Sequence, residues 1–283
     1  MPKEIGNLDE LISLDLRTSS ITELPKSFNQ LKKLLFFYYP QALAKKVKRA
    51  YPKLYIYNNL DELPSDLTQV FRLNLSNQEL ETVPECIKDM SNLIELDLSK
   101  NKLTTLPQTI GNLVFLQKLD LSKNELMSLP KEIGQLISLV ELNIPNNNLS
   151  VLPESIGNLK QLTFLYLIKN QLVSLPSSLG ELVHLNILFV GENQLQNLPE
   201  TIGNLKNLKS LWLNNNELIT LPNSIGALSK LEVLMLYSNE IRQLPKEIGK
   251  LTKLERLLLF YDNPIPSKKK EPLSKLLPNC SVE

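Results

Sequence analysis

The sequence is poor in the residues that carry metal-ion and nucleophilic chemistry. Its 283 residues include one histidine and two cysteines. The histidine, His184, lies in the segment ELVHL, where equivalent segments have Phe115, Lys230 or Lys253, so a solvent-facing side chain is expected. A zinc site lacks partners, and no serine or cysteine has a base beside it. The sequence therefore predicts no catalytic residue, no metal ion and no cofactor, and it predicts that the chain is not an enzyme.

The chain also lacks an excess of charge and a long apolar run. Its 31 basic and 30 acidic residues nearly cancel, which argues against electrostatic capture of nucleic acid. The basic runs at 45–49 and 268–270 have no interleaved aromatic residues and are interpreted as solvated faces. No apolar run of about 18 residues and no basic-then-apolar leader occurs. We therefore expect no membrane insertion and a cytoplasmic protein by default, or a secreted one if a leader was trimmed.

The sequence is rich in one repeated pattern. Each unit follows L-P-x-x-I-G-x-L-x-x-L-x-x-L-x-L-x-x-N-x-L-x-x, and residues 106–128, LPQTIGNLVFLQKLDLSKNELMS, are a full copy. Such a fixed period indicates a repeat architecture. The prolines that mark it recur every 23 residues, at Pro84, Pro107, Pro130, Pro153, Pro176, Pro199, Pro222 and Pro245.

This pattern resembles that of leucine-rich repeat proteins. Its L-P-x-x-I-G form is similar to plant intracellular Ras-group-related repeats and to spirochaete bacterial arrays, and the resemblance covers nearly all of the chain. It implies an α/β horseshoe solenoid with a parallel sheet on the concave side, and a role in binding other proteins.

The residues predict the same architecture independently. In L-x-L, two leucines flank one exposed residue, which is the period-2 pattern of a short strand with one buried face. After the proline, apolar residues recur at every third position, so 3₁₀-like or irregular turns should form the convex side. No single unit can enclose its own leucines, so neighbouring coils must stack around one continuous core.

An asparagine follows each regular strand. Its side-chain amide is expected to turn inward and to bond the backbone of adjacent coils, which would otherwise be buried and unpaired. Ser19, Gln78 and Asp262 replace the asparagine elsewhere, so those coils should be less regular. The column consists of Asn101, Asn124, Asn147, Asn170, Asn193, Asn216 and Asn239.

The 23-residue period of the repeat is interrupted once, near the start of the chain. The interval from Pro25 to Pro64 is 39 residues, and the extra material resembles the basic segment at the end of the chain. We interpret residues 264–283 as a C-terminal cap and residues 40–57 as an irregular cap-like insertion. Both belong to a single predicted solenoid of residues 1–283.

This alignment predicts where strands and helices lie outside the regular repeats. Leu54 and Cys280 take the strand positions of the two cap-like segments, which brings the sheet to about twelve short strands. Little α-helix is expected outside residues 41–51 and 267–277, where an apolar inner face can pack on the neighbouring coil.

The residue between the two strand leucines should stand on the concave face, and its character changes along the chain. It is Asp97, Asp120 and Asn143 in three successive coils, and it is then apolar in the next five. Neighbouring columns change at the same place. We expect these side chains to be exposed and to form a partner-binding surface of Phe164, Tyr166, Ile168, Ile187, Phe189, Trp212, Val233, Met235, Tyr237, Leu258 and Phe260.

The favoured hypothesis is a protein-binding scaffold that holds a protein partner on this aromatic half of the concave face. Contiguous apolar area marks contact surfaces, and Trp and Tyr often anchor interfaces. The competing interpretation is that flanking loops cover these side chains, or that they are retained for cross-strand packing.

Two hypotheses of other classes stay open at this point. The chain could be the recognition part of an effector enzyme whose catalytic domain is absent. It could also be a self-associating structural protein, a homo-oligomer formed through the N-terminal coils, because Met1 stands where a repeat leucine belongs and no cap is evident there.

Overall fold

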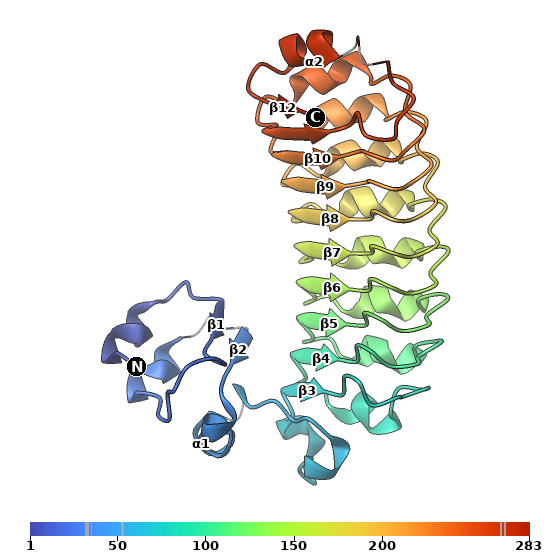
Figure 1. Cartoon of the computed structure of the whole chain (residues 1–283). Coiled ribbons are helices and arrows are strands. Elements are labelled where there is room, and N and C mark those ends of the chain that lie inside the picture. The colour runs from blue at the N-terminus through green and yellow to red at the C-terminus, as the bar shows by residue number, and fades with distance from the viewer. Residues whose placement is uncertain (32–33, 35, 52–53, 267, 269) are drawn as a thin grey trace. The chain divides into compact units, whose positions relative to one another are not determined.

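The chain divides into two compact units, Met1–Asn74 and Leu75–Glu283, in the computed structural model shown in Figure 1. The structure describes residues 1–283 apart from residues 32–33, 35, 52–53, 267 and 269. The expectation that residues 1–283 form a single solenoid stays a prediction, as does the cap-like character of 40–57 and 264–283.

Each coil of the second unit contributes one short strand to a parallel sheet. The strands pair in sequence order, so that spatial neighbours are also neighbours along the chain (Figure 1). Pairing aligns the repeat leucines, for example Leu119 with Leu142. The strands are β4 (Glu95–Asp97), β5 (Lys118–Asp120), β6 (Glu141–Asn143), β7 (Phe164–Tyr166), β8 (Ile187–Phe189), β9 (Ser210–Trp212), β10 (Val233–Met235), β11 (Arg256–Leu258) and β12 (Ser281–Val282).

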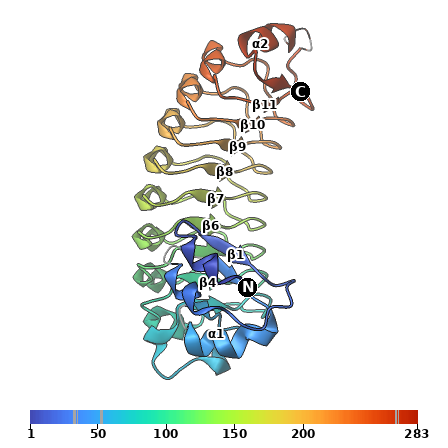
Figure 2. The same cartoon turned by 90° about the vertical axis from the view of Figure 1, so that its left-hand side faces the viewer.

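A second layer of 3₁₀ turns runs beside the strands, as Figure 2 shows for the second unit. A proline precedes each turn, with φ between −57° and −69°, and the turn ends at a leucine, or at Met90 in η7. Proline suits this position because its ring already holds that φ and the turn needs no N–H there. The turns are η7 (Glu85–Asp89), η8 (Gln108–Asn112), η9 (Lys131–Gln135), η10 (Glu154–Asn158), η11 (Ser177–Glu181), η12 (Glu200–Asn204), η13 (Asn223–Ala227) and η14 (Lys246–Lys250).

The core of the second unit lies between these two layers. Repeat leucines such as Leu116, Leu119 and Leu121 have no exposed surface. Full burial of a leucine side chain contributes about 2 kcal/mol, so the repeated leucines are the main stabilising residues of the unit. An open parallel sheet with 3₁₀ turns on its other side confirms the predicted fold class.

The asparagine column turns inward as predicted. Asn124 donates from Nδ2 to the carbonyl oxygens of Leu98 and Leu121, at 2.9 and 3.0 Å, and accepts at Oδ1 from the Leu103 N–H at 3.0 Å. One side chain therefore joins two coils through backbone groups that would otherwise be buried and unpaired. The same pattern recurs at the other asparagines from Asn101 to Asn239, and all are at least nine-tenths buried.

The coil that lacks this asparagine uses the next residue instead. Asp262 occupies the asparagine position but is exposed. Asn263 accepts from the Ile241 N–H at 3.0 Å and donates to the Leu236 carbonyl oxygen at 2.8 Å. The irregularity predicted at Asp262 is thus that the inward side-chain amide comes from the residue one position later in the chain.

The repeat glycine allows neighbouring 3₁₀ turns to approach each other closely. A Cβ at Gly180 would lie 2.4 Å from the carbonyl oxygen of Thr201 in the next coil, which no side chain can tolerate without movement. Lys88 replaces this glycine in η7. A cleft of about 190 Å³ opens there between η7 and η8, lined by Lys88, Ile87 and Ile110 among others. The glycine column therefore controls how tightly the turns stack.

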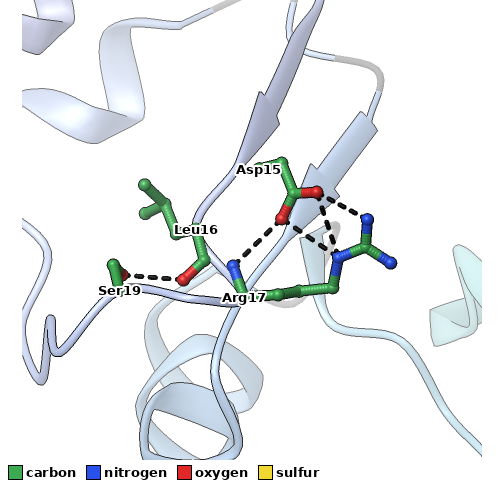
Figure 3. A network of polar contacts seen from close by, with 4 residues as sticks. All are labelled: Asp15, Leu16, Arg17 and Ser19. Atoms are coloured by element: carbon green, nitrogen blue, oxygen red, sulfur yellow. Dashed lines mark hydrogen bonds and ion pairs between the residues drawn. The ribbon is translucent and has the colours of Figure 1, made fainter.

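The first unit has its own small sheet and its own aromatic core. β1 (Ser13–Asp15) and β2 (Phe36–Tyr38) pair in parallel, and Phe28 and Phe37 pack with ring centroids 4.8 Å apart. At the end of β1, Asp15 accepts hydrogen bonds from the backbone and the guanidinium of Arg17 (Figure 3). The elements are η1 (Lys3–Asn7), β1 (Ser13–Asp15), η2 (Lys26–Gln30), β2 (Phe36–Tyr38), η3 (Gln41–Leu43), α1 (Ala44–Ala50), η5 (Leu60–Glu62), η6 (Leu67–Gln69) and β3 (Arg72–Asn74).

Two predicted strand positions were wrong. Leu54 is half-buried and outside any strand, while Tyr57 is buried and pairs with Leu73. At the chain's end, Val282 rather than Cys280 pairs with Leu257. These segments lack the L-x-L pattern, so the aligned prolines misplaced the register by two or three residues.

The predicted helical segments contain the two α-helices of the described residues. α1 begins at Ala44, and Val47 on its inner face and Leu43 directly before it are both fully buried. The second helix, α2 (Lys270–Leu276), packs against η14, where Leu276 lies beside Gly249. Part of the range 267–277 lies outside the described residues. Within the described part of the chain, no helix combines the length and the apolar character needed to cross a bilayer.

Candidate functional site

The apolar residues between the strand leucines form one row in the second unit. We call Tyr166, Phe189, Trp212, Met235 and Leu258 the apolar stripe. Strand pairing places each of them directly beside the next. The Tyr166 and Phe189 rings meet edge to face with centroids 5.4 Å apart, and the Phe189 and Trp212 rings stack at 3.8 Å and 15°. The sheet register thus assembles the row that the sequence column predicted.

The other predicted residues lie in the columns on either side of the stripe. Phe164 pairs with Ile187 across β7 and β8, and Val233 begins β10. Ser210 interrupts that column. Ile168, Tyr237 and Phe260 follow the strands, and the Tyr237 ring packs edge to face with Tyr261 at 6.3 Å. The three columns run in parallel over neighbouring coils.

The exposure predicted for these residues was too high. All eleven predicted side chains are half-buried in the structure, and none is fully exposed. Adjacent strands lie about 4.8 Å apart, so a ring in one coil covers a face of the ring in the next coil. Only the outward surface of the row is open to solvent. Their role in partner binding stays a prediction.

The polar half of the same column makes hydrogen bonds of its own. Asp97 and Asp120 each accept from the backbone N–H two residues later, at 2.9 Å. Asn143 donates to the second carboxylate oxygen of Asp120 at 2.7 Å. Such local bonds close the turn that follows the strand. In the aromatic half, rings replace these carboxylates and pack on one another.

Tyr166 lies at the border between the two halves. Burial raises the pKa of its phenol, and the nearby Glu141 carboxylate raises it further, while Lys118 partly offsets the effect. Glu141 itself pairs with Lys118 at 3.2 Å. The stripe therefore begins beside an ion pair and runs away from it.

Two further ion pairs flank the stripe on its two sides. Lys169 pairs with Glu192 at 3.4 Å, just after the strands, and Lys209 pairs with Glu232 at 3.6 Å, just before them. Each pair joins neighbouring coils. The charges beside the centre of the stripe are thus paired within the protein, whereas Arg256, which begins β11 beside Leu258, is exposed.

Two polar atoms near the centre of the stripe are shielded from solvent and have no hydrogen-bond partner among the described residues. They are the indole Nε1 of Trp212 and Oδ1 of Asn214. Asn214 is more than nine-tenths buried, and its carboxamide lies over Gly191, where a Cβ would come within 2.8 Å of Oδ1. Such unpaired groups cost free energy and call for an explanation.

Sequence reasoning missed a second set of apolar side chains, which are more exposed than the stripe. Met127, Val173 and Ile219 follow the last repeat leucine of their coils and are about half exposed or more. Their column could have been found by its position, but it alternates with polar residues such as Gln196. Apolar residues scattered singly in this way are ordinary on protein surfaces.

The reactive side chains of the second unit are few and dispersed. His184 is exposed, and Cys86 and Cys280 are free thiols of intermediate exposure. Burial raises the pKa of the Cys86 thiol, and the nearby Asp89 carboxylate adds to this, so the thiol stays protonated at neutral pH. Among the described residues, no three His, Cys, Asp or Glu side chains are grouped to hold a metal ion.

Comparison with known proteins identifies the repeats. Residues 141–218 match the leucine-rich repeat region family, and residues 68–126 match the leucine rich repeat family. No curated protein sequence matches the chain.

Solved structures similar to this chain were also found. The plant peptide hormone receptor RGFR1, in complex with RGF2, is 28% identical over 93% of this chain and 46% of the receptor chain, with a TM-score of 0.64. The leucine-rich repeat ectodomain of the receptor kinase GASSHO1/SCHENGEN3 from Arabidopsis thaliana was solved in complex with CASPARIAN STRIP INTEGRITY FACTOR 2. It is 28% identical over 100% of this chain and 36% of the receptor chain, with a TM-score of 0.62. A leucine-rich repeat protein of Leptospira interrogans is 28% identical over 99% of this chain and 97% of the Leptospira chain, with a TM-score of 0.38. This chain spans less than half the length of the two plant receptors.

Proposed function

Because this chain is a leucine-rich repeat protein, we propose that it is a protein-binding scaffold and that it holds its partner on the aromatic half of the sheet's open face. The observation that carries this proposal is the apolar stripe, which continues in register from Tyr166 to Leu258. No catalytic role is proposed. The leucine-rich repeat receptors similar to this chain were solved in complex with RGF2 and CASPARIAN STRIP INTEGRITY FACTOR 2, which supports a general role in protein interaction.

The stripe differs from the rest of the face in a way that suits binding. Core packing requires the repeat leucines, which are already buried in every regular coil. The polar half shows that the fold accepts Asp97 and Asp120 at the stripe's position. Aromatic side chains are therefore not needed there for the fold. Trp and Tyr are enriched among the residues that dominate binding energies.

The proposal is tested with the full chain immobilised and incubated with an extract of its source cells. Proteins retained by the wild-type chain are identified by mass spectrometry, and the affinity of the purified partner is measured for each variant. Trp212→Ala should weaken binding by about 2 kcal/mol or more, which is roughly thirtyfold.

Two control variants separate the stripe from other surfaces. Asp120→Asn changes the same column on the polar half and keeps its shape, and Ile219→Ala removes an exposed apolar side chain on the loop edge. Both should leave binding within about threefold of wild type. The proposal would be wrong if Trp212→Ala and the wild-type chain, both folded, bound the partner with equal affinity.

A further inference from the structure

The coils that carry the centre of the stripe present no net charge on the open face. Residues 163–169, 186–192, 209–215 and 232–238 contain two lysines and two glutamates, Lys169, Glu192, Lys209 and Glu232. They form two ion pairs, Lys169 with Glu192 at 3.4 Å and Lys209 with Glu232 at 3.6 Å. A charged partner group placed on this surface would lose its hydration without finding a free counter-charge. The surface therefore favours an uncharged partner segment.

The polar half of the face differs in this respect. Asp97 and Asp120 occur in neighbouring coils, and Lys100 and Lys123 follow them in the turns. A charged segment would find partners there and not on the centre of the stripe. Charge thus discriminates between the two halves of one continuous sheet.

The two unpaired atoms at the centre of the stripe point to a more specific feature of the partner. Trp212 Nε1 is a donor, and Asn214 Oδ1 is an acceptor. The two residues are two positions apart along the chain, and side chains at this spacing on a strand and its extension share one face. Three of the other unpaired atoms are serine hydroxyls, and those serines lie in the 3₁₀ turns or against the repeat glycines. Among the unpaired atoms of the described residues, only those of Trp212 and Asn214 belong to a strand of the stripe or to the residues that directly follow it.

An amide group complements this pair. Its carbonyl oxygen accepts from an indole N–H, and its N–H donates to a carboxamide oxygen. An extended peptide segment carries such an amide at every residue and needs no charge to bind through them. Ring movement at Trp212 on binding would bring both shielded atoms into contact with it.

Resting on the function proposed above, we propose that the partner lays an uncharged, extended peptide segment across Phe189, Trp212 and Met235. A main-chain amide of this segment completes the hydrogen-bonding capacity of Trp212 Nε1 and Asn214 Oδ1, while an apolar side chain packs on the stripe. The proposal names the chemistry of the occupant and not its sequence.

The probe is a displayed library of random 12-residue peptides selected on the full chain, with prior depletion on the Trp212→Ala variant. Enriched sequences are synthesised with blocked ends, and their affinities are measured in solution. We expect the segments required for binding to contain no Asp, Glu, Lys or Arg and to include an apolar anchor. Introducing a lysine or an aspartate beside the anchor should weaken binding about tenfold or more.

The amide contact is tested with two nearly isosteric variants. Trp212→Phe keeps a ring against Phe189 but removes the N–H, and Asn214→Leu keeps the volume over Gly191 but removes the acceptor. Each should weaken the selected peptides about tenfold. Asn204→Leu, on the exposed end of η12, is the matched control and should have no effect. As Trp212 is the only tryptophan, a single indole N–H resonance reports the contact directly and should shift downfield in the complex.

The outcomes separate this inference from the proposed function. Trp212-dependent peptides that require a charged residue would overturn the inference and leave the protein-binding stripe intact. Unchanged affinities for Trp212→Phe and Asn214→Leu, or an indole resonance that does not move on saturation, would overturn the amide contact. If no enriched peptide depended on Trp212, the peptide inference would be overturned, while the proposed function would still be decided by the affinity of Trp212→Ala for the purified partner.

Discussion

The phenyl ring of Phe189 lies nearly parallel to the indole of Trp212, with ring centroids 3.8 Å apart and an interplanar angle of 15°. The two residues face each other across β8 and β9. Each ring therefore contributes to the stability of the sheet as well as to the surface that it presents. This double role changes what a substitution at either position should do.

Replacing Trp212 by alanine should lower the free energy of unfolding by about 1–3 kcal/mol, because it uncovers one face of Phe189 and loses the buried part of the indole. A double-mutant cycle with Phe189→Ala should give a coupling of about 0.5–1.5 kcal/mol. Urea denaturation followed by circular dichroism measures both. The sequence alone predicts an exposed ring, whose removal would change stability little. A coupling near zero would restore that earlier expectation.

Asn170→Ala should be among the most destabilising single substitutions in the second unit. It removes the bonds from Nδ2 to the Ile144 and Leu167 carbonyl oxygens and from the Leu149 N–H to Oδ1, all between 3.0 and 3.1 Å. The backbone groups left behind are buried, so we expect a loss of about 2–4 kcal/mol. Asn158→Ala, at an exposed position, is the control for denaturant unfolding. Similar midpoints for the two variants would show that the inward amides matter little.

Gly180→Ala should destabilise the stack of 3₁₀ turns by about 1–3 kcal/mol, because the new methyl group would collide with the Thr201 carbonyl oxygen at 2.4 Å. Lys88 stands at the corresponding position in η7, where the cleft toward η8 leaves room for a side chain. Lys88→Ala is therefore the control. We expect it to change stability by less than about 0.5 kcal/mol. Melting temperatures of the two variants compare these effects. A smaller loss for Gly180→Ala than for Lys88→Ala would contradict the packing role of the glycine column.

The first unit should lose stability in alkaline solution. Burial raises the pKa of Tyr55 to about 12, with further contributions from the Glu62 carboxylate. The folded state thus keeps this phenol protonated where the unfolded state ionises, near its ordinary pKa of about 10. The stabilisation is fully present below pH about 10 and is lost as the pH rises toward 12. Absorbance titration of phenolate should show Tyr55→Phe removing a late-titrating group, and a wild-type chain whose tyrosines all titrate near 10 would refute this.

The sequence by itself determined the regular coils of this protein. The 23-residue period placed every strand from β4 to β11, the proline turns and the inward asparagines, because each of these depends on local geometry repeated without change. The column containing Phe189 and Trp212 was also readable, since alternation along a strand decides which residues share a face. The L-x-L pattern is absent around Leu54 and Cys280, so the sequence did not predict the strand register there correctly.

Only the tertiary structure decided how the side chains of neighbouring coils meet. The stacking of Phe189 on Trp212, the shielding of Asn214 over Gly191 and the pairing of Lys169 with Glu192 each join residues 23 positions apart. Their outcome depends on rotamers and on the spacing of about 4.8 Å between strands, neither of which a one-dimensional pattern specifies. A predicted column of exposed rings therefore became a half-buried stripe, and its two unpaired polar atoms appeared only when the coils were packed together.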